Sequence, residues 1–337
     1  MQRREALTTI LATVCAATTA IVGGAMPFAE AVAQERYPSR PVTLIVPFAA
    51  GGLNDATARL WAENVKGPLG GTLVIDNRGG AGGTIGAAEV ARAKPDGYTL
   101  LLGSSTTQVM NPAVMPKVPY DPLKDFTAVS IFAVATATIA VHPSVPAKSL
   151  TELAAYIRAN PGKESYGSAG TGTNSHLAGE MFKHLAGGLD MVHIPYKGGG
   201  AAVSDLIAGH IKVASPHMTA QVLELHNTGK IRVLAVASPK RLQGAPDLPT
   251  SAESGLPGLV ATTFNGIFAP ANTPADIITR IDAATQAAMK NREFLDALVK
   301  GGFDPVTGVG GEAAQRYVAE EVNRLTPVIK ATRFMQK

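Results

Sequence analysis

Three glycine-rich turns stand out in this sequence, each where an apolar strand pattern ends and a helical pattern begins. They read PFAAGGLNDATAR (47–59), NRGGAGGTIGAAEVARA (77–93) and YGSAGTGTNSHLAGEMF (166–182). The first N–H groups of a helix have no intrahelical partner, and the helix dipole adds about half a positive charge there. A glycine-rich turn at this point can hold an anion without a charged side chain. The chemistry indicated is the binding of a small carboxylate.

The first turn offers main-chain donors and contains an acidic residue with two interpretations. Its glycines let the backbone at 51–54 approach a carboxylate and donate to it. Asp55 is either a site residue or a structural one, because it can cap the helix and stands four residues before Arg59, the spacing of a helical ion pair. Phe48 either lines the entrance of a cleft or fills the core.

The second turn superficially matches a dinucleotide-binding turn. Its spacing, Gly80-x-Gly82-x-x-x-Gly86, departs from G-x-G-x-x-G, and Asp96 stands before the next strand and not at its end, where a ribose partner belongs. We therefore expect no nucleotide cofactor, and we expect the backbone at 81–84 to contact the same small ligand.

The third turn combines hydroxyl and amide groups with free N–H groups at 168–174. It is longer than a simple helix cap by Thr173 or Asn174 requires, which favours ligand contact. An alternative is catalysis, with Ser168 as nucleophile and His176 as base. The nucleophile motif G-x-S-x-G is incomplete, however, because Tyr166 replaces its first glycine.

A fourth turn, YKGGG (196–200), also opens a helix, and Lys197 either neutralises a distal carboxylate or faces water. The seven histidines show no H-x-x-x-H or H-E-x-x-H spacing, so no metal site is predicted. Because the nucleophile motif at Ser168 is incomplete, no catalytic residue is predicted either. The predicted ligand-binding residues are Phe48, Ala50, Gly51, Gly52, Asn54, Asp55, Ala81, Gly82, Thr84, Ser104, Thr106, Ser168, Gly170, Thr171, Thr173, Asn174, His176, Tyr196, Lys197 and Gly198.

Residues 1–33 have the features of an export signal. Two arginines stand near the start, no charge occurs over 6–29, and AVA at 31–33 is a small-x-small cleavage pattern. We expect cleavage and a periplasmic mature chain, with an uncleaved anchor as the alternative and the export route, Sec or twin-arginine, left open. The single cysteine, Cys15, lies in this segment, so the mature chain has no cysteine for disulfides or catalysis. The net charge of +4 is too small to indicate nucleic-acid binding.

Apolar strand patterns alternate with helical patterns in the remainder, which predicts an α/β fold. Extended crossings near 133–144 and 261–270 bracket a middle α/β series, so we expect the chain to leave one lobe, build a second and return. Each lobe is expected to be a mostly parallel sheet flanked by helices, with two crossover strands as the hinge. The expected bounds are 34–140 plus 265–337 for lobe 1 and 141–264 for lobe 2.

Five runs taken together resemble one known family. They are PFAAGGLNDATAR, NRGGAGGTIGA, PDGYTLLLG (95–103), GSAGTGTNSHLAGEMF and HIPYKGGGAAVSDLIAGHI (193–211). They are similar, in order and over nearly the whole mature chain, to the Bug family of TctC-like solute-binding proteins. Two framework positions depart from the family pattern, because Gly80 and the pair at 201–202 stand where prolines are common.

The resemblance implies a periplasmic receptor with the two-lobe type II periplasmic-binding-protein fold. In that family, turns from both lobes hold one carboxylate of a small organic ligand, partly through ordered water. We expect a monomer that delivers a mono-, di- or tricarboxylate or an acidic amino acid to the membrane permease subunits of a tripartite tricarboxylate transporter. An exported serine hydrolase using Ser168 and His176, and a carboxylate sensor for a signalling partner, stay open as alternatives.

Overall fold

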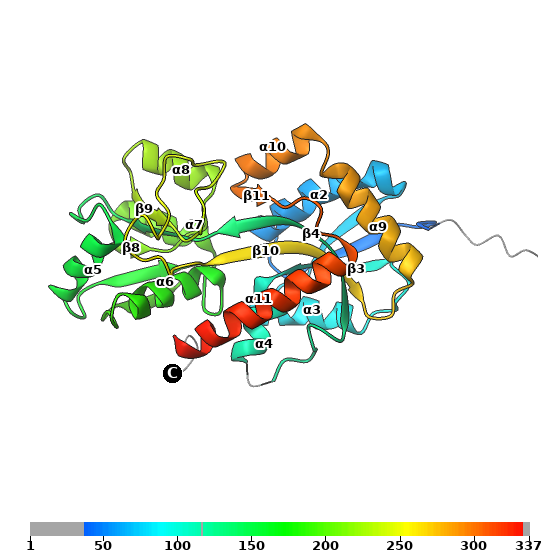
Figure 1. The fold of residues 1–337 in the computed structure, drawn as a ribbon, viewed down its shortest axis with the longest axis horizontal. Coiled ribbons are helices and arrows are strands. Elements are labelled where there is room, and N and C mark those ends of the chain that lie inside the picture. The colour runs from blue at the N-terminus through cyan, green and yellow to red at the C-terminus, as the bar shows by residue number, and fades with distance from the viewer. Residues whose placement is uncertain (1–36, 116, 333–337) are drawn as a thin grey trace, which may run out of the picture. The chain divides into compact units, whose positions relative to one another are not determined.

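The computed structural model describes residues 37–115 and 117–332, and the export signal expected at 1–33 lies outside them. Two β-sheets form the centre of the described chain, in the orders β11-β4-β10-β3-β1-β2 and β7-β6-β8-β5-β9 (Figure 1). The first contains β1 (Val42–Val46), β2 (Leu73–Asn77), β3 (Thr99–Ser104), β4 (Phe126–Thr136), β10 (Thr262–Pro270) and β11 (Phe303–Pro305). The second contains β5 (Thr138–Val141), β6 (Ser165–Ser168), β7 (Val192–Pro195), β8 (Val213–Ala214) and β9 (Arg232–Val236).

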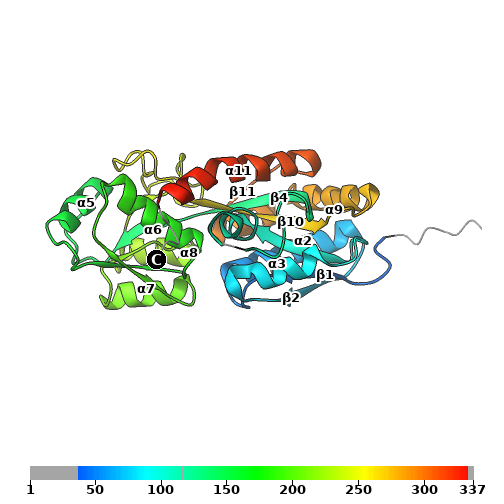
Figure 2. The same ribbon diagram turned by 90° about the horizontal axis from the view of Figure 1, so that it is seen from below.

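Helices cover both faces of both sheets (Figure 2). Those around the first sheet are α2 (Leu53–Leu69), α3 (Thr84–Ala91), α9 (Ala275–Ala288), α10 (Arg292–Lys300) and α11 (Gly311–Ala331), with shorter turns η1 (Ala81–Gly83), η2 (Thr106–Met110) and α4 (Asn111–Val114). Those around the second are α5 (Leu150–Arg158), α6 (Asn174–Leu185), α7 (Gly199–Ala208) and α8 (Ala220–Asn227).

Continuous apolar strands follow from this double coverage. In β1, Leu44 packs with Trp61 of α2, whereas the next residue, Ile45, packs in the cluster that contains α3 and α11. Successive side chains of a strand point to opposite faces, so a strand buried on both faces must be apolar at every position. The same alternation places Leu100 and Leu101 of β3 in the two different clusters.

Most strands of each sheet run in one direction, as expected, although both sheets also contain antiparallel pairs. β1 pairs in parallel with β2 and β3, but β10 is antiparallel to β3 and β4, and β11 is antiparallel to β4. In the second sheet, β6 pairs in parallel with β7 and β8, while β5 is antiparallel to β8 and β9. The antiparallel pairs all involve strands that carry the chain between sheets or return it, and an apolar run alone does not specify the direction of a neighbouring strand.

The chain crosses between the sheets at a compact backbone junction. Ala137, which separates β4 from β5, donates its N–H to Ala261 at 3.0 Å and accepts from Ala237 at 2.8 Å. Ala261 in turn donates to Ala237 at 2.9 Å, and all three side chains are buried. The two crossing segments and the segment after β9 are thus held together by a ring of backbone hydrogen bonds, and their small side chains allow this close approach.

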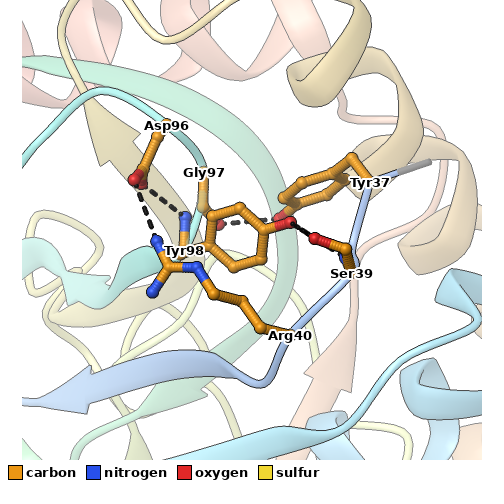
Figure 3. A network of polar contacts seen from close by, with 6 residues as sticks. All are labelled: Tyr37, Ser39, Arg40, Asp96, Gly97 and Tyr98. Carbon is orange, nitrogen blue, oxygen red and sulfur yellow. Dashed lines mark hydrogen bonds and ion pairs between the residues drawn. The ribbon is translucent and has the colours of Figure 1, made fainter. Parts of the chain in front are cut away.

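A polar network fastens the segment before β1 to the turn before β3 (Figure 3). Tyr37 donates its hydroxyl to the carbonyl of Gly97 at 2.7 Å, and Arg40 forms a 3.1 Å ion pair with Asp96. The Arg40 guanidinium also lies 3.9 Å from the ring centroid of Tyr98, a cation–π contact. Asp96 therefore helps to join these two segments.

Most elements expected from the sequence are confirmed within a few residues. At the start of α5, Ser149 caps the helix by accepting from the N–H of Glu152 at 3.1 Å, and the Glu152 carboxylate accepts from Lys148 N–H. Sequence patterns missed β11, α8 and the helical turns over 106–114. These pieces are short, and the periodicity that identifies an element needs more residues than they contain.

Candidate ligand-binding site

A cavity of about 750 Å³ lies between the loops of the two lobes. Lobe 1 contributes the turn between β1 and α2, together with residues after β3 and at the start of β10. Lobe 2 contributes the starts of α6 and α7 and the segment between β8 and α8. Of the predicted site residues, those that line it are Phe48, Ala50, Gly51, Gly52, Asn54, Ser104, Thr106, Thr173, Asn174, Lys197 and Gly198.

The start of α2 presents backbone donors to this cavity. Its N-cap residue, Gly52, has no side chain to accept from them, and Gly51 adopts φ +79°, a conformation that glycine tolerates. Asp55 lies beneath the turn, accepting from Gly51 N–H at 2.9 Å and pairing with Arg59 at 3.1 Å. The hydrogen bond from Arg59 is the main reason that the pKa of Asp55 is lowered. Asp55 does not line the cavity, and its role here is to brace the turn.

In lobe 2, the start of α7 also presents backbone donors to the cavity. Gly198 is the N-cap at φ +133°, again without a side-chain hydrogen bond, and Gly199 and Gly200 follow with open space where a Cβ would lie. Lys197 is exposed at the cavity wall and is the only Lys or Arg among the described lining residues. Tyr196 lies outside the lining and donates to Asp205 at 2.7 Å.

Two further helices begin at the cavity, and in each a side-chain cap satisfies one of the first-turn donors. Thr173 accepts from His176 N–H at the start of α6, at 3.2 Å. Thr219 accepts from Val222 N–H at the start of α8, also at 3.2 Å. Among the helix starts that line this cavity, those of α2 and α7, one from each lobe, lack a side-chain cap.

The second glycine-rich turn supports the first instead of lining the cavity. Ala81, Gly82 and Thr84 lie outside the lining residues. A Cβ at Gly83 would approach the Phe48 ring within 3.2 Å, and the Gly82 carbonyl accepts from Asn111 at 2.8 Å. The glycines here are needed for close packing behind the 47–52 segment.

The deeper part of the third turn is also structural. Ser168 is fully buried, and its hydroxyl lies 2.7 Å from Nε2 of His193. The rings of His193 and His176 stack with centroids 3.8 Å apart, next to Tyr166. Gly170, Thr171 and the Ser168–His176 pair do not line the cavity. The geometry therefore does not favour the hydrolase alternative.

Sequence reasoning missed several residues of the wall. The most informative are His217, Thr219 and Gln221, which lie in and after the loop that follows the two-residue strand β8. Burial lowers the pKa of His217 to about 4. The YKGGG run in the sequence indicated Gly199 and Gly200, whereas no sequence pattern indicated His217.

Other kinds of site find no support in the described ranges. Across residues 37–115 and 117–332, no three His, Cys, Asp or Glu side chains gather as metal ligands. Among the helices that the structure describes, none is long and apolar enough to cross a membrane. A second cavity of about 220 Å³ is lined by residues such as Met218, Val299 and Phe303, and its wall is mainly apolar. The helix that begins there, α8, has a side-chain cap.

Two sheets joined by crossing strands, with a cavity between the lobes, define a two-lobe periplasmic-binding-protein fold. Residues 57–334 match the family described as "Tripartite tricarboxylate transporter family receptor". The chain belongs to this family, whose members are periplasmic solute-binding receptors and not enzymes.

Individual relatives align with this chain along nearly their full length. Protein BugT of Bordetella pertussis is 35% identical over 305 residues, covering 90% of this chain and 93% of BugT. R. palustris Rpa4515, solved with adipate, is 34% identical with a TM-score of 0.81, covering 88% of this chain and 98% of that one. MatC from Rhodopseudomonas palustris, solved with bound malate, is 32% identical with a TM-score of 0.78, and the match covers 87% of this chain and 100% of MatC.

Proposed function

We propose that this protein captures a small organic carboxylate in the cavity between its lobes and delivers it to the membrane permease of a tripartite tricarboxylate transporter. The observation that carries the proposal is the meeting of two helix starts without side-chain caps, α2 from one lobe and α7 from the other, at one cavity. Lys197 adds a positive charge to the same wall. A carboxylate satisfies donors of both lobes at once.

These donors are sufficient for useful affinity. Micromolar binding requires about 8 kcal/mol. A helix terminus contributes up to about 2 kcal/mol in a partly buried site, and each charge-assisted hydrogen bond about 1.5 to 3 kcal/mol. Two helix starts and a few hydrogen bonds reach this total without any enclosed charged side chain.

The ligands of the relatives support a small organic carboxylate as the ligand. The adipate of Rpa4515 and the malate of MatC are both small dicarboxylates. We assign ligand contact to the predicted residues that line the cavity, and a bracing role to Asp55, Thr84 and Ser168, which hold hydrogen bonds behind it. The identity of the carboxylate depends on the wall away from the helix starts.

The proposal extends to export and to lobe movement. Residues 1–33 serve as the cleaved export signal, and the mature chain works as a monomer. Lobe 1 is assigned to 34–140 plus 265–337 and lobe 2 to 141–264, with the backbone junction of Ala137, Ala237 and Ala261 beside the hinge. A ligand that contacts both lobes favours their closure, because only the closed state offers both sets of donors.

Titration calorimetry of the mature chain tests the proposal. The panel contains mono-, di- and tricarboxylates and acidic amino acids, each with its uncharged amide as a control. We expect at least one carboxylate to bind with micromolar affinity or better while its amide does not. Folded, ligand-free protein that binds no member of the panel would contradict the proposal.

A further inference from the structure

His217 occupies a fixed position in the cavity wall. The carbonyl of the preceding residue, Pro216, accepts from the N–H of Thr138 at 2.8 Å, and the N–H of Met218 donates to Thr136 at 2.8 Å. His217 itself forms an isolated antiparallel bridge with Ala137. The backbone that carries this imidazole is therefore attached to the crossing segment between the lobes.

The imidazole is neutral and incompletely satisfied. Its Nε2 is covered by protein and has no hydrogen-bond partner among the described residues. Burial lowers the pKa of His217 to about 4, so at pH 7 the ring has one N–H donor and one acceptor nitrogen. Native proteins rarely leave a buried polar atom unpaired, because the loss of a hydrogen bond to water is not compensated.

Two more wall residues share this property. The hydroxyl of Ser104 and Oδ1 of Asn174 are also buried without a partner among the described residues, and both residues line the same cavity. Unpartnered atoms thus come from lobe 1 and from lobe 2. Because these residues line one cavity, a polar ligand bound there would complete the hydrogen bonding of the wall.

Resting on the proposed carboxylate function, we infer that His217 contacts the bound ligand and selects for a second oxygen-bearing group on it. The helix starts of α2 and α7 hold the first carboxylate, and His217 offers a neutral hydrogen bond to the rest of the guest. The ligand class is a carboxylate with a second carboxylate, a hydroxyl or a keto oxygen. A plain alkyl carboxylate leaves the imidazole unsatisfied.

Matched ligand pairs and variants of His217 test this inference. Calorimetry compares succinate with butyrate and adipate with hexanoate, each pair differing in the second carboxylate. The variants are His217→Leu, which removes the hydrogen bond, and His217→Asn, which retains a polar amide. His210→Leu is the control, because His210 is an exposed histidine of the same lobe that does not line the cavity.

We expect the wild type to prefer the dicarboxylate of a pair. His217→Leu is expected to weaken dicarboxylate binding about tenfold and to change monocarboxylate binding less than about twofold, the scale of one lost hydrogen bond. His217→Asn restores part of the preference, and His210→Leu changes nothing. A shift of the His217 side-chain ¹⁵N resonances on addition of the dicarboxylate provides a second readout that does not depend on a variant's folding.

The outcomes separate this inference from the proposed function. A wild type that binds carboxylates, with unchanged preference in His217→Leu and unmoved His217 resonances, overturns the role of His217 only. A wild type that prefers the alkyl carboxylate also overturns it. A wild type that binds none of the four compounds or any of the wider panel overturns the proposed function itself.

Discussion

The side-chain amide of Asn174 donates a 2.7 Å hydrogen bond to the carbonyl oxygen of Thr262. Asn174 is the first residue of α6 in lobe 2, and Thr262 is the first residue of β10, which returns the chain to the first sheet. A buried side chain of the cavity wall thus fixes a lobe-2 helix to a crossing strand. The proposed ligand contact and the attachment of α6 to a crossing strand therefore involve the same residue.

Replacing Asn174 is expected to disturb both properties. Asn174→Asp keeps the size but removes the donor and places a carboxylate opposite a carbonyl, so we expect a loss of about 2 kcal/mol in the free energy of unfolding and weaker binding of anions. Urea unfolding and calorimetry measure the two effects. Asn64→Asp is the control, since Asn64 donates within α2 to Leu60 and does not line the cavity. Equal effects of the two variants on binding would argue against this role.

Adding one methyl group at the start of α7 is expected to block the site without unfolding the protein. Gly199 has no positive φ, and no atom lies within 4 Å of the place that a Cβ would take, so Gly199→Ala introduces no strain and occupies cavity space. We expect carboxylate affinity to fall about tenfold and the melting temperature to stay the same or rise. Gly67→Ala has the same freedom in α2 but lies outside the cavity lining, so it should leave binding unchanged.

Asp55 gives a pH-dependent prediction for the turn before α2. Its pKa is lowered from 3.8 in the folded state, so the unfolded chain takes up the proton first as pH falls. Its stabilising contribution is complete above about pH 4 and is lost as pH falls through the lower folded pKa. We expect Asp55→Asn to cost about 1 kcal/mol at pH 7 and progressively less below about pH 4. A cost that stays constant from neutral pH to well below the unfolded pKa in urea unfolding would contradict this account.

His217 affects stability in a different pH window. Its pKa falls from 6.5 to about 4 on folding, so between these values the unfolded state binds a proton that the folded state does not. Stability therefore decreases as pH is lowered through this window, by about 3 kcal/mol for this group. As pH is lowered through this window, the unfolding free energy of His217→Leu should rise relative to that of the wild type by the same amount. An unchanged difference across the window would show that the imidazole is not desolvated.

The sequence predicted the elements of this fold better than their arrangement. Buried strands such as β1 and β3 are continuous apolar runs, and helix starts are marked by their turn residues. Which turn reaches the cavity depends on strand order, which no local pattern encodes. β1 lies inside the first sheet and β2 at its edge, so the turn after β1 borders the cavity and the similar turn after β2 packs behind it.

His217 illustrates the second limit of sequence reasoning. It follows a strand of two residues and precedes a short helix, so its neighbourhood has no periodicity to interpret. Its place in the cavity wall is set by tertiary hydrogen bonds of its neighbours Pro216 and Met218 with Thr138 and Thr136 of the crossing segment. A single histidine in a loop shows neither burial nor the absence of a partner, and both properties emerge only when the lobes are assembled.

The central claim is that backbone amides at the starts of α2 and α7 hold one carboxylate between the lobes. A crystal structure of the mature chain with its tightest-binding carboxylate measures this directly. We predict that the carboxylate oxygens reach backbone nitrogens both at 52–54 and at 198–200, either directly at about 2.7 to 3.1 Å or through one ordered water. A carboxylate bound outside this cavity, or one inside it whose oxygens reach only one helix start or neither, would contradict the account.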